Sequence, residues 1–498
     1  SKALAKIPTS ADKRLAKAQE DLQKSYSARF TRLQDVDPLT PAATFLNAIA
    51  SSFDPHTVYL PPAEKENFDI QMSGSLEGIG AVLVEEEHFI GVREVVAGGA
   101  SWRQGELEAG DLILSVAQEG EDAVDIGDMK INKVVKMIRG PKDTTVTLTI
   151  EKEDGSIKTI SIVRDRVVLE DAYARGAILQ NAGKAPVGYI YLPSFYGDTR
   201  HRQAQTRGSA SDVKALLTKI ARQGVEGVII DVRSNGGGLL DDSRKMTGLF
   251  IKEGPVVQTQ LPDGTIEVLR DKDPSITYDG KVVVLIDRFS ASASEILAAA
   301  LQDYGRAVVV GPGPTHGKGT VQALLDLNRA KLTQEGPSMG VLKLTIQQFF
   351  RVNGSSTQWK GVTPDIAFPD SLKHLKTGER NLDNSLPWTS VDKLSYTRWK
   401  AQGWDKAALL QKSLARQAKS EHFTNLTKRS LLLKKRQDQT MVPLRRADYE
   451  AKLKAERSEM EALSPDSKKA KDLFSVRFVP YGPKKPDTAR ASDRPRKD

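Results

Sequence analysis

The sequence predicts an α/β protein in which a β-rich module precedes a layered α/β domain with a largely parallel core sheet, and helical regions flank both. Short runs rich in β-branched residues fill residues 73–166, whereas apolar strand-like runs alternate with helical stretches across residues 167–370. Charged segments with helical spacing occupy both ends of the chain. The 498 residues, 39% hydrophobic and 28% charged, suffice for two to four water-soluble domains, each with its own core.

Residues 1–72 are predicted to form an N-terminal helical segment that leads into the core. The stretch LAKAQEDLQKSYSARFTRLQ, residues 15–34, carries its apolar residues at helical spacing. The three prolines of DPHTVYLPP, residues 54–62, then indicate a loop.

Residues 73–166 are predicted to form a compact domain of several strands around one helix. The helix is expected in DMKINKVVKMIRG, residues 128–140, where Gly140 and Pro141 provide a stop.

Residues 167–370 are predicted to form the α/β domain, because buried apolar strands separated by helices are typical of a parallel sheet covered on its faces. The expected strands are residues 187–196, 225–233, 281–289 and 306–311, and the expected helices are residues 211–224, 242–251 and 292–305.

Residues 371–498 are predicted to be a basic helical region that ends in a disordered tail. They hold 30 Lys/Arg and 16 Asp/Glu, a balance of +14 in a chain whose net charge is +9. Because aromatic residues are not interleaved with this charge and no nucleic-acid-binding motif is present, a solvated helical surface is favoured. We therefore expect no nucleic-acid partner.

The cysteine and histidine content also limits which catalytic and metal-binding sites the chain can form. The absence of cysteine excludes disulfides, thiol nucleophiles and thiolate metal sites. The six histidines are scattered and form no H-E-x-x-H pattern, so we expect no metal and no cofactor.

Three serines on alternate positions, Ser290, Ser292 and Ser294, precede the apolar part of the predicted helix 292–305. Ser292 and Glu295 fit the S-x-x-E capping box, so a helix cap is the simplest interpretation. A serine at a helix N-terminus is also well placed as a nucleophile, because the helix dipole and nearby N–H groups stabilise negative charge there. The absence of G-x-S-x-G, and of histidine in residues 281–310, argues against an ordinary hydrolase elbow.

Lys318 is the candidate base, since it stands alone between Gly317 and Gly319. A lysine has an unperturbed pKa of about 10.4, which burial can lower by several units. A lysine in a surface turn is the alternative. The spacing from Gly311 to Gly317 is one residue too long for a Walker A phosphate loop, and glycine follows the lysine where Ser or Thr is required.

Two glycine-rich turns complete the candidate chemistry. SNGGG, residues 234–238, follows a buried strand and is a candidate oxyanion hole, because glycine lets backbone N–H groups approach a reacting carbonyl. SLEGIGAVL, residues 75–83, could turn successive N–H groups toward the C-terminal carboxylate of a peptide. Ordinary turns are the alternative in both places, but a helix at 128–140 beside an edge groove favours peptide binding for the second.

Six segments together resemble the C-terminal processing peptidases, in their tail-specific protease branch. They occur in family order between about residues 45 and 390: FLNAIASSFDPHTVYL, SLEGIGAVL, IIDVRSNGGG, DRFSASASEILAAALQDYGRA, HGKGTVQ and FFRVNGSSTQWKGVTPDI. The resemblance implies a PDZ domain at 73–166 and a crotonase-like serine peptidase core at 167–370. It implies a Ser/Lys endopeptidase that binds nonpolar C-terminal tails of proteins through the PDZ domain and processes or degrades them in the periplasm.

The resemblance also assigns roles to individual positions. Ser292 corresponds to the nucleophile, Lys318 to the general base and Gln322 to the residue that positions this base. The implied oxyanion donors are the backbone amides of Gly237 and Ala293. The implied carboxylate-binding loop consists of Gly78, Ile79, Gly80 and Ala81.

Asp303 matches an acidic position that is functionally sensitive in the family, which makes it a candidate supporting residue. It lies eleven residues after Ser292, so in one continuous helix it would be about 16 Å further along the axis. A structural role is therefore expected for Asp303 in place of a triad role.

Two departures from the family pattern carry further expectations. The loop GPGPTHGKGT is one residue longer than usual. Lys318 therefore keeps its family position relative to Ser292 only if the extra residue bulges out before Thr315. Otherwise the chain would be an inactive PDZ scaffold. Compared with the family pattern, the N-terminal helical segment of this sequence is short, and the sequence does not include the signal peptide that family members carry. An adaptor protein, the periphery of the inner membrane and further copies of the chain are the candidate partners besides substrates.

Overall fold

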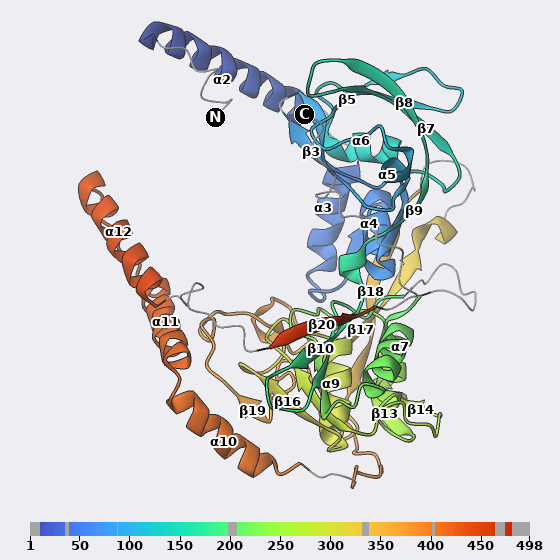
Figure 1. The fold of residues 1–498 in the computed structure, drawn as a ribbon, viewed down its shortest axis with the longest axis vertical. Coiled ribbons are helices and arrows are strands. Elements are labelled where there is room, and N and C mark those ends of the chain that lie inside the picture. Colours follow the sequence, from blue (N-terminus) through green and yellow to red (C-terminus); the bar gives the residue numbers. More distant parts are fainter. Residues whose placement is uncertain are drawn as a thin grey trace. The chain divides into compact units, whose positions relative to one another are not determined.

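The computed structural model describes residues 10–34, 39–86, 88–197, 207–330, 338–400, 404–463 and 474–480 (Figure 1). The chain divides into two compact units. The first includes residues 1–45 and 75–169, and the second includes residues 46–74 and 170–486, as far as they are described. The predicted tail after residue 480 lies outside the described residues.

The first unit contains a six-stranded sheet in the order β3-β4-β5-β7-β8, with β6 paired to β5, and a separate antiparallel pair, β2 and β9. Its strands are β2 (Ser75–Gly78), β3 (Ala81–Glu86), β4 (Phe89–Val95), β5 (Leu112–Gln118), β6 (Val124–Asp125), β7 (Thr145–Glu151), β8 (Ile157–Val163) and β9 (Asp165–Val168). Its helices are α2 (Ala11–Gln34), α5 (Ala100–Gln104) and α6 (Ile131–Ile138).

The core of the first unit follows from alternation along its strands. In β7, Val146, Leu148 and Ile150 are fully buried while their neighbours are half-exposed. Val134 and Ile138 of α6 join the same apolar core. The predicted β-rich domain and its amphipathic helix within residues 128–140 are thus confirmed, and α6 ends before Gly140 and Pro141 as expected. The short helix α5 is a second helix of this region that was not predicted.

The second unit is built around a seven-stranded sheet in the order β19-β16-β15-β12-β11-β10-β20. The five strands from β19 to β11 are parallel, and β10 and β20 are antiparallel additions at one edge, which confirms the largely parallel core sheet. The strands are β10 (Arg175–Gln180), β11 (Val187–Tyr191), β12 (Gly227–Asp231), β15 (Lys281–Leu285), β16 (Ala307–Gly311), β19 (Ile366–Ala367) and β20 (Ser475–Val479).

A second sheet of the same unit has the order β1-β18-β13-β14, with β17 also paired to β18. Its strands are β1 (Val58–Leu60), β13 (Gly254–Gln260), β14 (Ile266–Asp271), β17 (Thr320–Asp326) and β18 (Val341–Phe350). The residues of β1 fall within the predicted loop 54–62. Three residues between prolines are too short a run for a strand to be predicted from sequence, although Val58 and Tyr59 favour one, and pairing with β18, far away in sequence, makes them a strand.

The helices assigned wholly to this unit are α4 (Pro62–Ser73), α7 (Ser209–Ala221), α8 (Leu240–Gly248), α9 (Ala293–Asp303), α10 (Lys406–Ala418), α11 (Glu421–Gln437) and α12 (Arg446–Ala462). Helix α3 (Leu39–Ala50) continues from the first unit into the second. In α9, residues 293–301 are all buried, which explains their uniformly small or apolar character apart from Ser294 and Glu295. Within the described ranges, no helix combines the length and apolarity needed to cross a membrane.

Candidate active site

Ser292 lies in the turn between β15 and α9, and its backbone conformation is unusual. Its φ is +56° and its ψ is −114°, a left-handed geometry that costs a residue with a Cβ about 1–3 kcal/mol. A strained strand-to-helix turn is the geometry that presents the serine in hydrolase elbows. Because Ser290 and Ser294 stand where G-x-S-x-G requires glycine, a search for that motif misses the turn.

The two flanking serines serve the framework of this turn. The hydroxyl of Ser290 donates to the carbonyl oxygen of Val232 at 2.8 Å, and that of Ser294 donates to the carbonyl oxygen of Asn235 at 2.9 Å. Both side chains are fully buried, whereas Ser292 is half-buried. Of the three serines, Ser292 is therefore the one that a substrate could reach.

Gly237 packs directly against the serine turn. A Cβ on Gly237 would lie 2.8 Å from the Cβ of Ser292 and 3.1 Å from the nitrogen of Ala293, so only glycine fits there. The amide of Ala293 has no hydrogen-bond acceptor among the described residues, whereas the amide of Gly237 donates to Oδ1 of Asn235 at 2.9 Å. The sequence-predicted pair of oxyanion donors is thus adjacent to Ser292, with one of the two amides engaged by a side chain.

Glu295 connects the serine turn to the loop that carries Lys318. Its Oε2 accepts hydrogen bonds from the backbone amides of Ser292 at 2.7 Å and Lys318 at 3.0 Å. Its Oε1 accepts from the amide of Gly317 at 2.8 Å and from the hydroxyl of Thr315 at 2.5 Å. Burial raises the pKa of this carboxyl to about 7, even though all four hydrogen bonds favour its charged form.

Lys318 is partly buried and in contact with a polar side chain. Its Nζ donates to Oε1 of Gln322 at 2.5 Å. Burial, followed by the positive charge of Lys343 on β18, lowers the pKa of Lys318 to about 8. A lysine with this pKa is partly neutral near pH 7.5, so it can accept a proton.

Gln322 has both ends of its side-chain amide occupied. Its Nε2 donates to the hydroxyl of Thr320 at 2.9 Å and to that of Thr345 at 3.1 Å, while its Oε1 accepts from Lys318. The sequence-predicted positions Ser292, Lys318 and Gln322 are therefore linked, the first two through Glu295 and the last two by direct contact.

Asp303 is not part of this network. Its carboxylate accepts a bidentate hydrogen bond from Arg351, at 3.0 Å from Nε and 2.7 Å from the terminal nitrogen, and a third bond from Asn353 at 3.0 Å. All three contacts are structural and lie at the far end of α9.

In the first unit, the turn from Gly78 to Ala81 has the features of an anion-binding turn. The carbonyl oxygens of Ile79 and Gly80 accept from the amides of Ser101 and Val96, each at 2.8 Å. The amides of Ile79 and Gly80 have no acceptor among the described residues. Gly80 has a φ of +77°, which favours glycine at this position.

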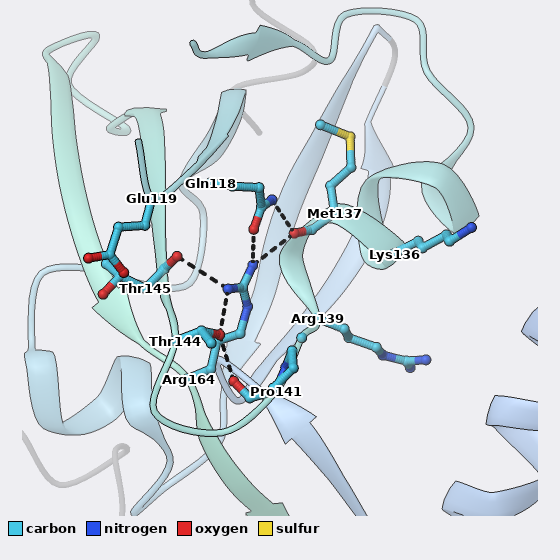
Figure 2. Close-up of a pocket in the computed structure, with 10 residues that line it drawn as sticks. Gln118, Glu119, Lys136, Met137, Arg139, Pro141, Thr144, Thr145 and Arg164 are labelled. Carbon is cyan, nitrogen blue, oxygen red and sulfur yellow. Dashed lines mark hydrogen bonds between the residues drawn. The ribbon is translucent and has the colours of Figure 1, made fainter. Parts of the chain in front are cut away.

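A pocket of about 340 Å³ lies near the carboxyl end of α6, around Arg164 (Figure 2). Every N–H of this buried guanidinium has an acceptor: the carbonyl oxygens of Met137, Ile138 and Thr145, the hydroxyl of Thr144 and the amide oxygen of Gln118. Arg164 therefore stabilises the end of α6 and has no donor left for a ligand. Across the described ranges, no group of His, Asp and Glu could hold a metal ion.

Several residues of the site were not predicted from sequence. Glu295 was recognisable only as half of a capping box, and Asn235 only as part of a glycine-rich turn. Thr345 and Lys343 lie on β18, to which no sequence motif pointed. Their roles depend on pairing between distant strands, which a local pattern does not reveal.

Four protein-family models match the chain. They are the tail specific protease N-terminal domain over residues 2–63, the PDZ domain over 67–151, peptidase family S41 over 186–368, and the C-terminal domain of tail specific protease over 372–496.

Individual proteins match as well. The tail-specific protease of Haemophilus influenzae is 38% identical over 477 residues, 95% of this chain and 65% of that protein. The carboxy-terminal-processing protease of Bartonella bacilliformis is 30% identical over 334 residues, 66% of this chain and 69% of that protein. Among solved structures, the PDZ domain of a carboxy-terminal protease from Vibrio cholerae is 41% identical over 19% of this chain and 97% of its own, with a TM-score of 0.18. The chain thus spans about two thirds of the length of these two full proteins.

Proposed function

The chain belongs to the C-terminal processing peptidases, in the tail-specific branch of peptidase family S41, and on that premise we propose that it is a serine endopeptidase with a Ser/Lys dyad. Ser292 is the nucleophile, Lys318 is the general base and Gln322 positions the base. The proposed substrates are proteins with nonpolar C-terminal tails.

The observation that carries the proposal is the double contact of Glu295. One carboxylate oxygen binds the backbone of both the nucleophile and the base. The longer lysine loop is therefore fastened to the serine turn at Lys318 itself. Together with the lowered pKa of Lys318, this supports a working dyad over an inactive scaffold.

The proposed reaction proceeds in two halves. Neutral Lys318 takes the proton of the Ser292 hydroxyl as Oγ attacks the scissile carbonyl, and the protonated lysine then gives this proton to the leaving amine. Water, deprotonated by the same lysine, hydrolyses the resulting acyl-enzyme and restores the serine.

Backbone amides stabilise the oxyanion that forms in each half. The amide of Ala293 is available for this role. Gly237 supplies the second donor after its amide leaves Oδ1 of Asn235, so this exchange of partners accompanies substrate binding. Asn235 has a second anchor, since its Nδ2 donates to the carbonyl oxygen of Leu192 at 2.9 Å.

The PDZ domain is proposed to bind the substrate's C-terminal carboxylate at Gly78, Ile79, Gly80 and Ala81. The amides of Ile79 and Gly80 supply donors, and the aliphatic stem of Arg139 lies about 3.7 Å from where a Cβ on Gly78 would be. The proposed compartment is the periplasm, and cell fractionation with antibody detection tests it.

The dyad is tested by cleavage of an unfolded protein that ends in an apolar tail. We expect Ser292→Ala and Lys318→Ala to abolish cleavage, exposed Lys281→Ala to leave it unchanged, and EDTA to have no effect. Cleavage that survives either dyad substitution would contradict the mechanism. Tail binding without any cleavage by the unaltered chain would indicate the non-catalytic PDZ scaffold instead.

Tail recognition is tested separately with paired substrates. The same substrate with a C-terminal carboxamide, or with two terminal aspartates, should be cleaved more slowly at low substrate concentration because binding is weaker. Equal cleavage of all three substrates would contradict recognition of the tail by the PDZ domain.

A further inference from the structure

Asp54 belongs to the SSFDPHTVYL stretch, and its buried carboxylate has a network of donors. It accepts from the amides of His56 at 2.8 Å and Thr57 at 3.1 Å, from the hydroxyl of Thr57, and from the hydroxyl of Thr345 at 2.9 Å. Burial raises the pKa of Asp54, but these hydrogen bonds outweigh it and hold the pKa below its ordinary value. Asp54 is therefore ionised at neutral pH and acts only as an acceptor.

The bond between Thr345 and Asp54 has a fixed direction. Because an ionised carboxylate cannot donate, the single hydrogen of the Thr345 hydroxyl must point to Asp54. Thr345 can then only accept from its other neighbour, which is the side chain of Gln322 at 3.1 Å. The nitrogen end of the Gln322 amide must face Thr345, and its oxygen end must face Lys318.

A strand irregularity brings Thr345 opposite Gln322. Along β17 and β18 the pairs run from Thr320 with Gln348 to Val321 with Gln347, and then to Gln322 with Thr345. Ile346 is thus the extra residue of a β-bulge. Without it, Ile346 would face Gln322 and the hydroxyl would be on the other face of the strand.

We propose that Asp54 and Thr345 are positioning residues of the peptidase, which orient the Gln322 amide so that its oxygen holds Nζ of Lys318. This proposal rests on the Ser/Lys mechanism proposed above. Neither residue touches the reacting atoms, so their effect passes through Gln322. The oriented amide keeps Nζ in one place as Lys318 alternates between its neutral and protonated forms.

The test compares substitutions at Thr345 in the full chain. Thr345→Val removes the hydroxyl but keeps the shape, and we expect kcat to fall about 10- to 100-fold with KM within about twofold, since a misplaced base slows chemistry more than binding. Thr345→Ser keeps the hydroxyl and should recover most of kcat. Asp54→Ala should lower kcat as well, because it removes the acceptor at Oδ1 and leaves the Thr345 hydroxyl free to turn toward Gln322.

Thr259→Val is the matched control. Thr259 is buried on β13 of the same sheet, and its hydroxyl has no partner among the described residues. This change should leave kcat unaltered. Equal kcat for Thr345→Val and Thr345→Ser, or a loss in Thr345→Val that appears in KM alone, would overturn the proposal.

Crystal structures test the positioning role without any measurement of catalysis, so the test does not depend on the proposed peptidase activity. In crystal structures of Ser292→Ala and of Ser292→Ala combined with Thr345→Val, we expect the Gln322 oxygen to contact Lys318 Nζ only in the former. Retention of that contact in the latter overturns the positioning role, whether or not the enzyme cleaves. Failure of the unaltered chain to cleave would overturn only the proposed function.

Discussion

Oε2 of Glu295 lies 3.0 Å from the backbone nitrogen of Lys318 and accepts its hydrogen bond. The third residue after the proposed nucleophile therefore anchors the loop that carries the proposed base, across the intervening strand β16. Thr315 and Gly317 bind the other oxygen of the same carboxylate. A side chain that caps a helix in its local role therefore also sets the relative position of the two proposed catalytic residues.

Replacing Glu295 by glutamine should damage both stability and catalysis. The amide presents N–H groups to donors that now bind an oxygen, so at least one buried donor loses its acceptor. We expect the free energy of unfolding to fall by about 2–4 kcal/mol, and kcat to fall as the lysine loop moves. Urea unfolding and steady-state kinetics measure the two effects. The control is Glu226→Gln, since Glu226 is an exposed carboxylate paired with Lys281. Its free energy of unfolding and its kcat should be almost unchanged. Losses as large as those of Glu295→Gln would contradict the role of Glu295.

The backbone strain at Ser292 can be measured by comparing the stability of two variants, Ser292→Gly and Ser292→Ala. Glycine adopts a φ of +56° and a ψ of −114° without penalty, whereas alanine retains the Cβ. After allowing for the greater freedom of glycine in the unfolded chain, we expect Ser292→Gly to be more stable than Ser292→Ala by about 1 kcal/mol. Thermal or urea unfolding of the two proteins measures this difference in stability. Lower stability of the glycine variant would mean that the turn is not strained.

The α/β core was predictable because its cues are local. The apolar strands 281–285 and 307–311 and the helix between them follow from hydrophobic period alone. The resemblance added roles for Ser292, Lys318 and Gln322. Asp54 remained hidden because β1 and β18 lie almost 300 positions apart in sequence, and their pairing brings it to this site. Lys343 and Thr345 remained hidden because the pairing of β17 with β18, with its bulge, places them near the base. The strand β20, formed by residues predicted to be helical or disordered, was missed for the same reason.

The pH dependence of cleavage should follow from the pKa of Lys318. The base must be neutral, so activity should rise with pH, with an apparent pKa near 8. Ionisation of Glu295, whose pKa is about 7, should also make activity rise with pH, because only the ionised carboxylate accepts all four hydrogen bonds. Removing the charge of Lys343 in Lys343→Met should raise the pKa of Lys318 and move this limb to higher pH. Profiles of kcat/KM for both proteins test this, and an unmoved or downward-shifted limb would contradict the electrostatic role of Lys343.

Asp303 provides a test that separates a structural acid from a catalytic one. Its carboxylate forms a nearly buried ion pair with Arg351, with exposed fractions of 8% and 14%. Asp303→Asn leaves that guanidinium without its charge partner, so we expect the free energy of unfolding to fall by about 3 kcal/mol. At a temperature where the variant remains folded, kcat should stay within about threefold of the unaltered chain, because Asp303 is far from Ser292 along α9.

The control is Asp241→Asn, which removes an exposed partner of Arg244 and Lys245. It should lower the free energy of unfolding by less than about 1 kcal/mol. A large drop in kcat with unchanged stability would instead place Asp303 in the catalytic machinery, and the geometry of α9 argues against that result.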